Sequence, residues 1–91
     1  MHQVVYREPA LNDLDRLEYQ TAQKIISKIS FYSEQENPLR FAKRLTNSAL
    51  GTYRFRIGHY RAIFDLDAKG KIQILMILRI KHRKDIYGLS S

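Results

Sequence analysis

The hydrophobic positions in the first part of the chain predict a strand followed by two helices. Residues 2–7 carry Val4, Val5 and Tyr6 and form a strand candidate, which ends where Pro9 suits the first turn of a helix. Leucines then recur at helical spacing and predict a short amphipathic helix. Its polar side is mostly acidic, and we expect it to face solvent; it carries Asp13, Asp15, Arg16 and Glu18.

A second, longer helix is predicted from residue 21 to about residue 36, because apolar positions again repeat with a helical period. Asn37-Pro38 ends this helix, since proline cannot continue the hydrogen-bonding pattern. The segment that follows contains Phe41 and Leu45 and is predicted to be a linker.

The next part of the chain predicts two strands joined by a tight turn, over residues 52–58 and 59–67. Alternation sends the aromatic and aliphatic residues of the first strand to one face of a sheet and its arginines to the other. Gly58-His59 fits a two-residue loop with glycine first, and such a loop fixes the register. The predicted cross-strand pairs are Ile57 with Tyr60, Arg56 with Arg61, Phe55 with Ala62 and Arg54 with Ile63.

A third strand of this series is predicted over residues 71–80, after a turn at 67–70. It is apolar on both sides, which predicts the most buried strand of the sheet. A short helix near residues 84–88 is expected to follow. The order is therefore β-α-α-β-β-β, and the predicted fold class is α+β, with two N-terminal helices packed on one face of a small twisted, mainly antiparallel sheet and a short C-terminal helix.

Composition adds that the chain is one small domain. It has 91 residues, of which 44% are hydrophobic and 27% charged, enough for a single core. It contains no cysteine, so a disulfide framework and a thiolate metal site are excluded, in agreement with a reducing compartment. No apolar run approaches the roughly 20 residues of a membrane helix, and no charged-then-apolar leader opens the chain. We expect a cytoplasmic protein with no membrane partner.

Charge is the feature that points to a partner. The net charge is +7, and residues 51–91 hold nine basic against three acidic residues, compared with seven against six in residues 1–50. Nucleic acid is therefore the first partner class to consider, and acidic protein the second. The predicted hairpin gathers Arg54, Arg56 and Arg61 on one face, although like charges directly opposite one another destabilise a sheet. A bound anion would explain the cluster; the alternative is an ordinary solvated sheet face.

Two segments carry a resemblance to a known family. Residues 51–64 (GTYRFRIGHYRAIF) and residues 77–87 (ILRIKHRKDIY), together with the element order, resemble the RelE/ParE superfamily of bacterial and archaeal toxins. These are the toxin halves of type II toxin-antitoxin pairs. RelE-like members are mRNA interferases that cut codons in the ribosomal A site, whereas ParE-like members poison DNA gyrase, and the fold alone does not separate them.

The site residues favour the RelE-like branch. The resemblance implies a site around the scissile phosphate, in which Arg54 and Arg56 stand where the best-known member has lysines, and His82 lies in the tail where some members carry a functional histidine. The implied catalytic residues are Arg61, Tyr87, His82, Arg83 and Lys81, and the implied phosphate-binding residues are Arg54, Arg56, Lys43 and Arg44.

The resemblance also implies the reaction and the partners. RNA cleavage without a metal proceeds by attack of the 2′-hydroxyl on the neighbouring phosphate, which needs proton transfer and donors to the phosphoryl oxygens. We assign Arg61 to the phosphoryl oxygens, supported by Arg56 and Arg83, and His82, Tyr87 or Lys81 to proton transfer. No cluster of metal-ligand residues occurs, so neither a metal nor a cofactor is expected. The implied partners are mRNA in the ribosomal A site and a cognate antitoxin, in a hetero-oligomer.

Several interpretations stay open at this stage. Tyr87 would alternatively stack on a base or anchor the end of the chain in the core. His59 in the turn and His2 read as surface residues. The function is an endoribonuclease, a ParE-like gyrase inhibitor or an inactive basic nucleic-acid-binding module.

Overall fold

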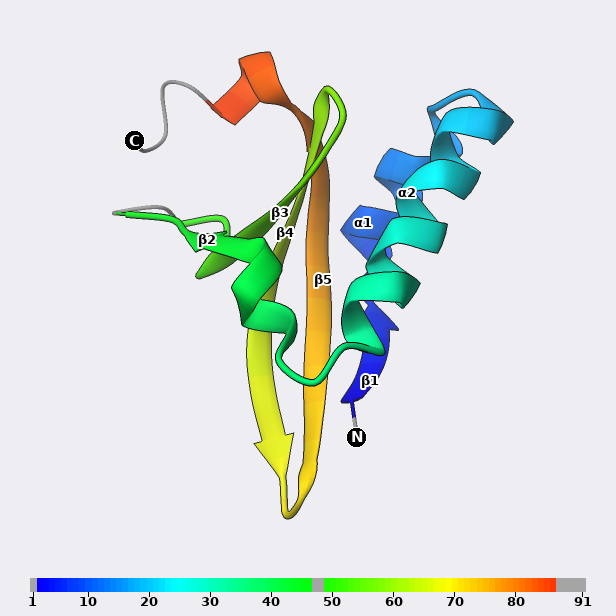
Figure 1. The fold of residues 1–91 in the computed structure, drawn as a ribbon. Helices are drawn as coiled ribbons and strands as arrows, with labels where there is room; N and C mark the ends of the chain where they lie inside the picture. Colours follow the sequence, from blue (N-terminus) through cyan, green and yellow to red (C-terminus); the bar gives the residue numbers. More distant parts are fainter. Residues whose placement is uncertain (1, 47–48, 87–91) are drawn as a thin grey trace.

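The N-terminal strand and both helices form as the sequence pattern predicts. The structure is a computed structural model, and it describes residues 2–46 and 49–86. The first three elements are β1 (His2–Tyr6), α1 (Glu8–Asp15) and α2 (Tyr19–Ser33). Pro9 lies in the first turn of α1, as expected from its missing N–H. Both helices lie on one side of the sheet (Figure 1).

A five-stranded sheet forms the centre of the fold. Its strands run in the order β1-β5-β4-β3-β2, and β1 is parallel to β5 while the other neighbours are antiparallel. The remaining strands are β2 (Ala42–Arg44), β3 (Tyr53–Ile57), β4 (Tyr60–Lys69) and β5 (Ile72–His82). The predicted fold class and the predicted hairpin register are both confirmed. Gly58 has a φ of 60°, the left-handed conformation that a turn of this kind requires.

The main core lies between the helices and one face of the sheet. Phe55 and Phe64 are fully buried and stack with ring centroids 4.3 Å apart. Ile25 and Ile29 of α2 face them, because apolar residues four positions apart share one side of a helix. Burial of these side chains supplies most of the driving force for folding.

The prediction that the strand over residues 71–80, now β5, is the most buried of the sheet holds only in part, because β4 has a longer run of buried residues. β5 lies between β1 and β4, and its residues on the helix side, Leu75 and Ile77, are fully buried. Ile74, Met76 and Leu78 on the opposite face are half-buried, because the helices cover only one face of the sheet.

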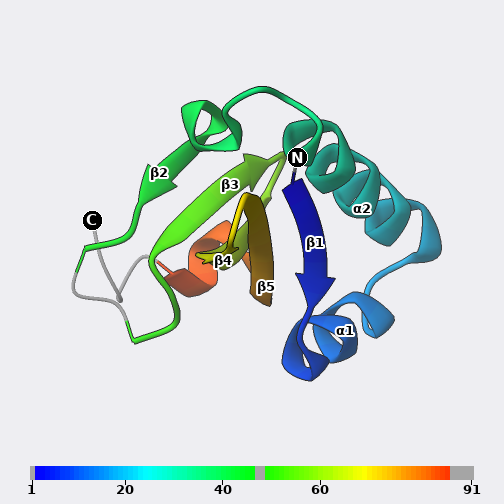
Figure 2. The ribbon, with the colours of Figure 1, turned by 90° about the horizontal axis from the view of Figure 1, so that it is seen from below.

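Three short elements differ from the predictions. The expected linker contains the 3-10 turn η1 (Pro38–Phe41) and the edge strand β2. The N–H of Leu39 in η1 donates to Oδ1 of Asn37 at 3.2 Å. β2 has three residues and exists through its pairing with β3, so it carries no periodic signal of its own. The predicted terminal helix is the 3-10 turn η2 (Arg83–Ile86), one residue earlier than expected. Figures 1 and 2 show η2 on the side of the sheet opposite the helices.

An ion pair attaches α1 to the last part of β5, which lies beyond Ile77, the last residue that pairs with β1. Asp13 accepts hydrogen bonds from Nε and Nη2 of Arg79, at 2.8 and 3.0 Å, and from the backbone N–H of Ile80 at 2.9 Å. Burial of Asp13 opposes its ionisation, but these hydrogen bonds and the charges of Arg79 and Lys81 outweigh it, so the pKa of this carboxyl lies below its ordinary value. The expectation that the acidic side of α1 is only solvated is therefore wrong at Asp13.

Asp13→Asn is expected to lower the free energy of unfolding by about 2 kcal/mol at neutral pH, since a hydrogen bond to a charged group contributes about 1.5–3 kcal/mol. The folded-state pKa of Asp13 is depressed, so its contribution is complete above the unfolded pKa of about 3.9 and is lost as the pH falls below it. Urea unfolding at neutral pH and at about pH 3 measures this dependence. Asp15→Asn, at an exposed position of the same helix, is the control. A stability difference independent of pH would contradict the ion pair.

Candidate functional site

The open face of the sheet carries a row of three cations on three neighbouring strands. Arg56 of β3 pairs with Arg61 of β4, and Arg61 pairs with Lys81 of β5. Directly opposed residues share a face of a sheet, so all three lie on the face away from the helices. We call Arg56, Arg61 and Lys81 the basic row. Every cross-strand partner within this row is another cation.

Arg61 forms the buried centre of the basic row. Its side chain is 7% exposed, and Nη1 donates to the carbonyl oxygens of Gly58 at 3.0 Å and Tyr60 at 2.9 Å. The guanidinium therefore folds back over the turn and fastens it. Arg56 is exposed and Lys81 is half-buried, so these two residues present the charge of the row to solvent.

A second, smaller core lies on the open face of the sheet. Leu45, Ile63 and Ile86 are buried together, and Leu50 packs against them. The segment before β3 is also tied to the sheet, because Oδ1 of Asp65 accepts from the N–H of Thr52 at 2.8 Å. This core fixes η2 against the sheet, as a buried aliphatic contact should.

Arg83 is fixed next to the turn, whereas Lys43 and Arg54 lie on β2 and β3. The N–H of Arg83 donates to the carbonyl oxygen of His59 at 2.8 Å. Lys43 pairs with Arg54, and Arg54 pairs with Ile63, which places these two cations on the open face beside the row. The predicted residues that the structure brings to the open face or its edge are Lys43, Arg54, Arg56, Arg61, Lys81 and Arg83.

His82 lies on the helix side of the sheet, unlike its neighbour Lys81. It pairs with Tyr60, and the two rings meet edge to face at 5.3 Å. Nδ1 of His82 accepts from the N–H of Lys84 at 3.2 Å. At the end of the hairpin the ring of His82 is also nearly parallel to that of His59, with centroids 6.1 Å apart. Because the sheet lies between them, a ligand on the basic row would contact His82 around the ends of the strands and not across the face of the sheet.

Two further predicted residues are not part of this arrangement. Arg44 pairs with Tyr53, so it lies on the helix side of the sheet. Tyr87 falls outside the described residues, directly after η2. The structure also shows two contacts that the sequence does not predict, one made by His59 and one made by Asp13. His59 and Asp13 read as surface residues, and only the pairing of distant segments shows His59 beside His82 and Asp13 beside Arg79.

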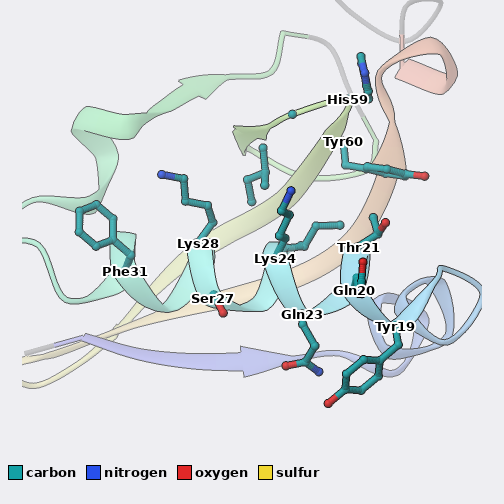
Figure 3. A pocket seen from close by; sticks show the side chains of 13 residues that line it. Tyr19, Gln20, Thr21, Gln23, Lys24, Ser27, Lys28, Phe31, His59 and Tyr60 are labelled. Carbon is teal, nitrogen blue, oxygen red and sulfur yellow. The ribbon is translucent and has the colours of Figure 1, made fainter.

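A groove of about 1020 Å³ adjoins the hairpin on the helix side, between α2 and residues 57–60 (Figure 3). Lys24 and Lys28 rise from α2 on the side where Tyr60 lies, and Phe31 lines one end. The residues lining the groove include no acidic side chain. We call this surface the α2 groove.

Neither a metal site nor a membrane span is found in the described part of the chain. In residues 2–46 and 49–86, no group of three or more His, Cys, Asp or Glu side chains is placed to hold a metal ion. No helix of these residues is both long and apolar enough to cross a membrane.

Comparison with known proteins identifies the family. Residues 4–87 match the family described as ParE toxin of type II toxin-antitoxin system, parDE. Toxin RelG of Mycobacterium tuberculosis (strain ATCC 25618 / H37Rv) is 31% identical over 84 residues, which cover 92% of this chain and 93% of RelG. The chain therefore belongs to the RelE/ParE superfamily of type II toxin-antitoxin toxins, as the sequence motifs predict.

Solved structures agree with this family. The RelBE2 toxin-antitoxin complex from Mycobacterium tuberculosis contains a chain with a TM-score of 0.70 and 27% identity, covering 89% of this chain and 96% of that one. The YoeB/ParE toxin from Agrobacterium tumefaciens has a TM-score of 0.65 at 17% identity, with coverages of 88% and 97%. A chain of the RelB-RelE antitoxin-toxin complex from Methanococcus jannaschii has a TM-score of 0.56 at 21% identity, with coverages of 92% and 95%. The last two similarities concern the fold alone.

Proposed function

We propose that this toxin is an mRNA interferase, a metal-independent endoribonuclease that cleaves ribosome-bound mRNA by attack of the 2′-hydroxyl. The observation that carries the proposal is the basic row, in which Arg56, Arg61 and Lys81 lie on adjacent strands with no acidic cross-strand partner. Such a row is unfavourable for folding alone, since opposed like charges repel. A phosphate oxygen placed between them turns this repulsion into attraction.

The cations of the row have different tasks in this mechanism. Arg56 and Lys81 reach solvent and hold the phosphoryl oxygens, and Arg83 closes the site from η2. Arg61 contributes positive charge from beneath and keeps the turn in place through its bonds to Gly58 and Tyr60. Donors fixed in advance stabilise the charge that grows on the phosphate without reorganising during the reaction.

Proton transfer falls to Lys81, His82 and Tyr87, since arginine has too high a pKa to act as a base. Nδ1 of His82 accepts from Lys84, so in the neutral ring the proton lies on Nε2. In the imidazolium form, in which Nδ1 is also protonated and the hydrogen bond from Lys84 is released, Nε2 gives its proton to the departing 5′ oxygen and the ring becomes neutral. We therefore assign the imidazolium of His82 as the general acid, and Lys81 or Tyr87 as the group that takes the 2′ proton.

We also propose a cognate antitoxin as the partner that silences this toxin. RelBE2 and the RelB-RelE pair are named as toxin-antitoxin complexes, and this chain shares their fold. Its net charge of +7, the basic row and the lysine-flanked α2 groove all favour an acidic, partly apolar segment. A segment bound across the hairpin would exclude mRNA from the row.

A second candidate is inhibition of DNA gyrase, because the matching family is described by its ParE members. One experiment separates the two. The chain is induced in cells that lack the adjacent antitoxin gene, and incorporation of labelled methionine and thymidine is followed together with primer extension on an abundant mRNA. We expect methionine incorporation to stop and new 5′ ends to appear at in-frame codon positions.

Other outcomes of the induction experiment contradict the interferase. Loss of thymidine incorporation alone, with an SOS response, would assign the chain to gyrase inhibition. No effect on either label would leave an inactive basic module.

Arg61→Ala and Tyr87→Phe are each expected to abolish toxicity. Arg61→Ala is expected to slow RNA cleavage about 100-fold or more, because it removes both the positive charge beneath the phosphate and the bonds that hold the turn, and loss of one preorganised group that stabilises developing charge usually costs about this much. Purified variants are compared by cleavage of mRNA on programmed ribosomes, and circular dichroism reports folding. Arg61→Lys keeps the charge but replaces the planar guanidinium, whose Nη1 makes both turn bonds, by an ammonium group, which separates the role of charge from that of the guanidinium geometry. Arg16→Ala, at an exposed arginine after α1, is the control. A fully toxic Arg61→Ala/Tyr87→Phe double variant would exclude this site.

The triple variant Arg54→Ala/Arg56→Ala/Arg61→Ala is expected to bind the antitoxin with an association rate at least about tenfold lower at low salt, since charge governs the encounter rate. Stopped-flow measurements across a range of salt concentrations test this. The matched control, Arg7→Ala/Arg16→Ala/Arg40→Ala, removes the same charge at three exposed positions elsewhere. Equal rates for the two triple variants would show that the open face does not steer the antitoxin.

A further inference from the structure

We propose that His59, in the turn between β3 and β4, stacks on an unpaired base of the RNA whose phosphate occupies the basic row. This inference rests on the proposed function and names a base-binding subsite for it. From the sequence alone, His59 is expected at the surface with no role of its own. In the structure its backbone is bonded to Arg83 and its ring lies parallel to that of His82.

The backbone of His59 is fixed beside the cations of the site. The carbonyl oxygen of Gly58, the preceding residue, accepts from Nη1 of Arg61 at 3.0 Å. The carbonyl oxygen of His59 itself accepts from the N–H of Arg83 at 2.8 Å. The turn is thus held from both sides by residues of the proposed phosphate site, and a nucleotide adjacent to the bound phosphate is brought to the turn.

The imidazole of His59 is oriented as part of a ring cluster. It points away from α2 at the end of the hairpin (Figure 3), and its plane is within 14° of that of His82, with centroids 6.1 Å apart. Tyr60 meets His82 edge-on at 5.3 Å and 80°. His59 is exposed while His82 and Tyr60 are half-buried, so the inner rings support an outer ring that is open to a ligand.

The observed backbone interactions of this turn do not involve the side chain of His59. Glycine is needed at position 58, where φ is 60°. The hydrogen bond to Arg83 uses the backbone of His59 and would persist with any side chain. An exposed aromatic ring beside phosphate-binding cations is the arrangement by which proteins bind single-stranded RNA, with the base on the ring and the phosphate on the cations.

The test uses an unpaired RNA oligonucleotide with 2-aminopurine placed at each position in turn and 2′-O-methyl groups throughout, which block attack by the 2′-hydroxyl. Binding is followed by 2-aminopurine fluorescence, for the free oligonucleotide and for the same sequence in the ribosomal A site. With the wild-type toxin we expect quenching at one position. His59→Ala is expected to lose this quenching and to weaken binding about tenfold, as when one base–aromatic stack is removed.

Three comparisons make the result specific to stacking. His59→Phe should retain the quenching, because it keeps a flat ring. His2→Ala, at a histidine on β1 outside the site, should behave like the wild type. The slope of log K against log salt should be the same for His59→Ala and the wild type, since the phosphate contacts remain.

Failure of the inference is distinguishable from failure of the proposed function. A wild-type toxin that binds and cleaves RNA, with His59→Ala showing unchanged quenching and affinity, would overturn the subsite alone. The same holds if His59→Ala and His59→Phe are equally defective, if His59→Ala changes the salt slope, or if it loses only antitoxin binding. A wild-type toxin that neither binds nor cleaves RNA, free or on the ribosome, would overturn both.

Discussion

Arg61 donates from one guanidinium nitrogen to the carbonyl oxygens on either side of His59, and the rest of the site depends on this pair of bonds. A cation that is 7% exposed is costly unless its donors find acceptors, and two carbonyl groups supply them here. The bonds hold positive charge in place before any ligand arrives. They also restrict the motion of the turn, because the side chain of Arg61 is bonded to the carbonyl oxygen of Gly58, the residue that begins the turn.

The two faces of the sheet have different roles: the helix side holds the main core, and the open face carries the basic row. The helix side buries the main core, including Phe55 and Phe64, whereas the cluster of buried hydrophobic side chains on the other face consists of Leu45, Ile63 and Ile86 among the described residues. Ile86 is therefore the principal apolar contact of η2, the turn that carries Arg83. A segment anchored by so small a cluster opens at lower free energy than the main core. Binding of a partner there would alter the site without unfolding the domain.

Sequence reasoning succeeded where one local signal decided the structure. Gly58 in a two-residue loop fixed the register of β3 and β4, and that register alone placed Arg56 opposite Arg61. β2 was not predicted, because three residues form a strand only when β3 supplies the hydrogen bonds. The ion pair between Asp13 and Arg79 joins residues 66 positions apart, and no local pattern reports such a contact.

Alternation along β5 also determines how two of the predicted site residues are arranged. Lys81 and His82 are adjacent in sequence and were assigned to one site, yet a strand sends neighbouring side chains to opposite faces. The pairing of Tyr60 with His82 and of Arg61 with Lys81 shows this division directly. A single phosphate reaches both groups only at the end of the strands, where His82 is no longer screened by the sheet. The proposed reaction therefore belongs at the tip of the hairpin, between Lys81 and Arg83, and not over the middle of the open face. That position lies beside His59, which explains why a base-binding ring would be useful in a turn whose observed backbone interactions do not involve that ring.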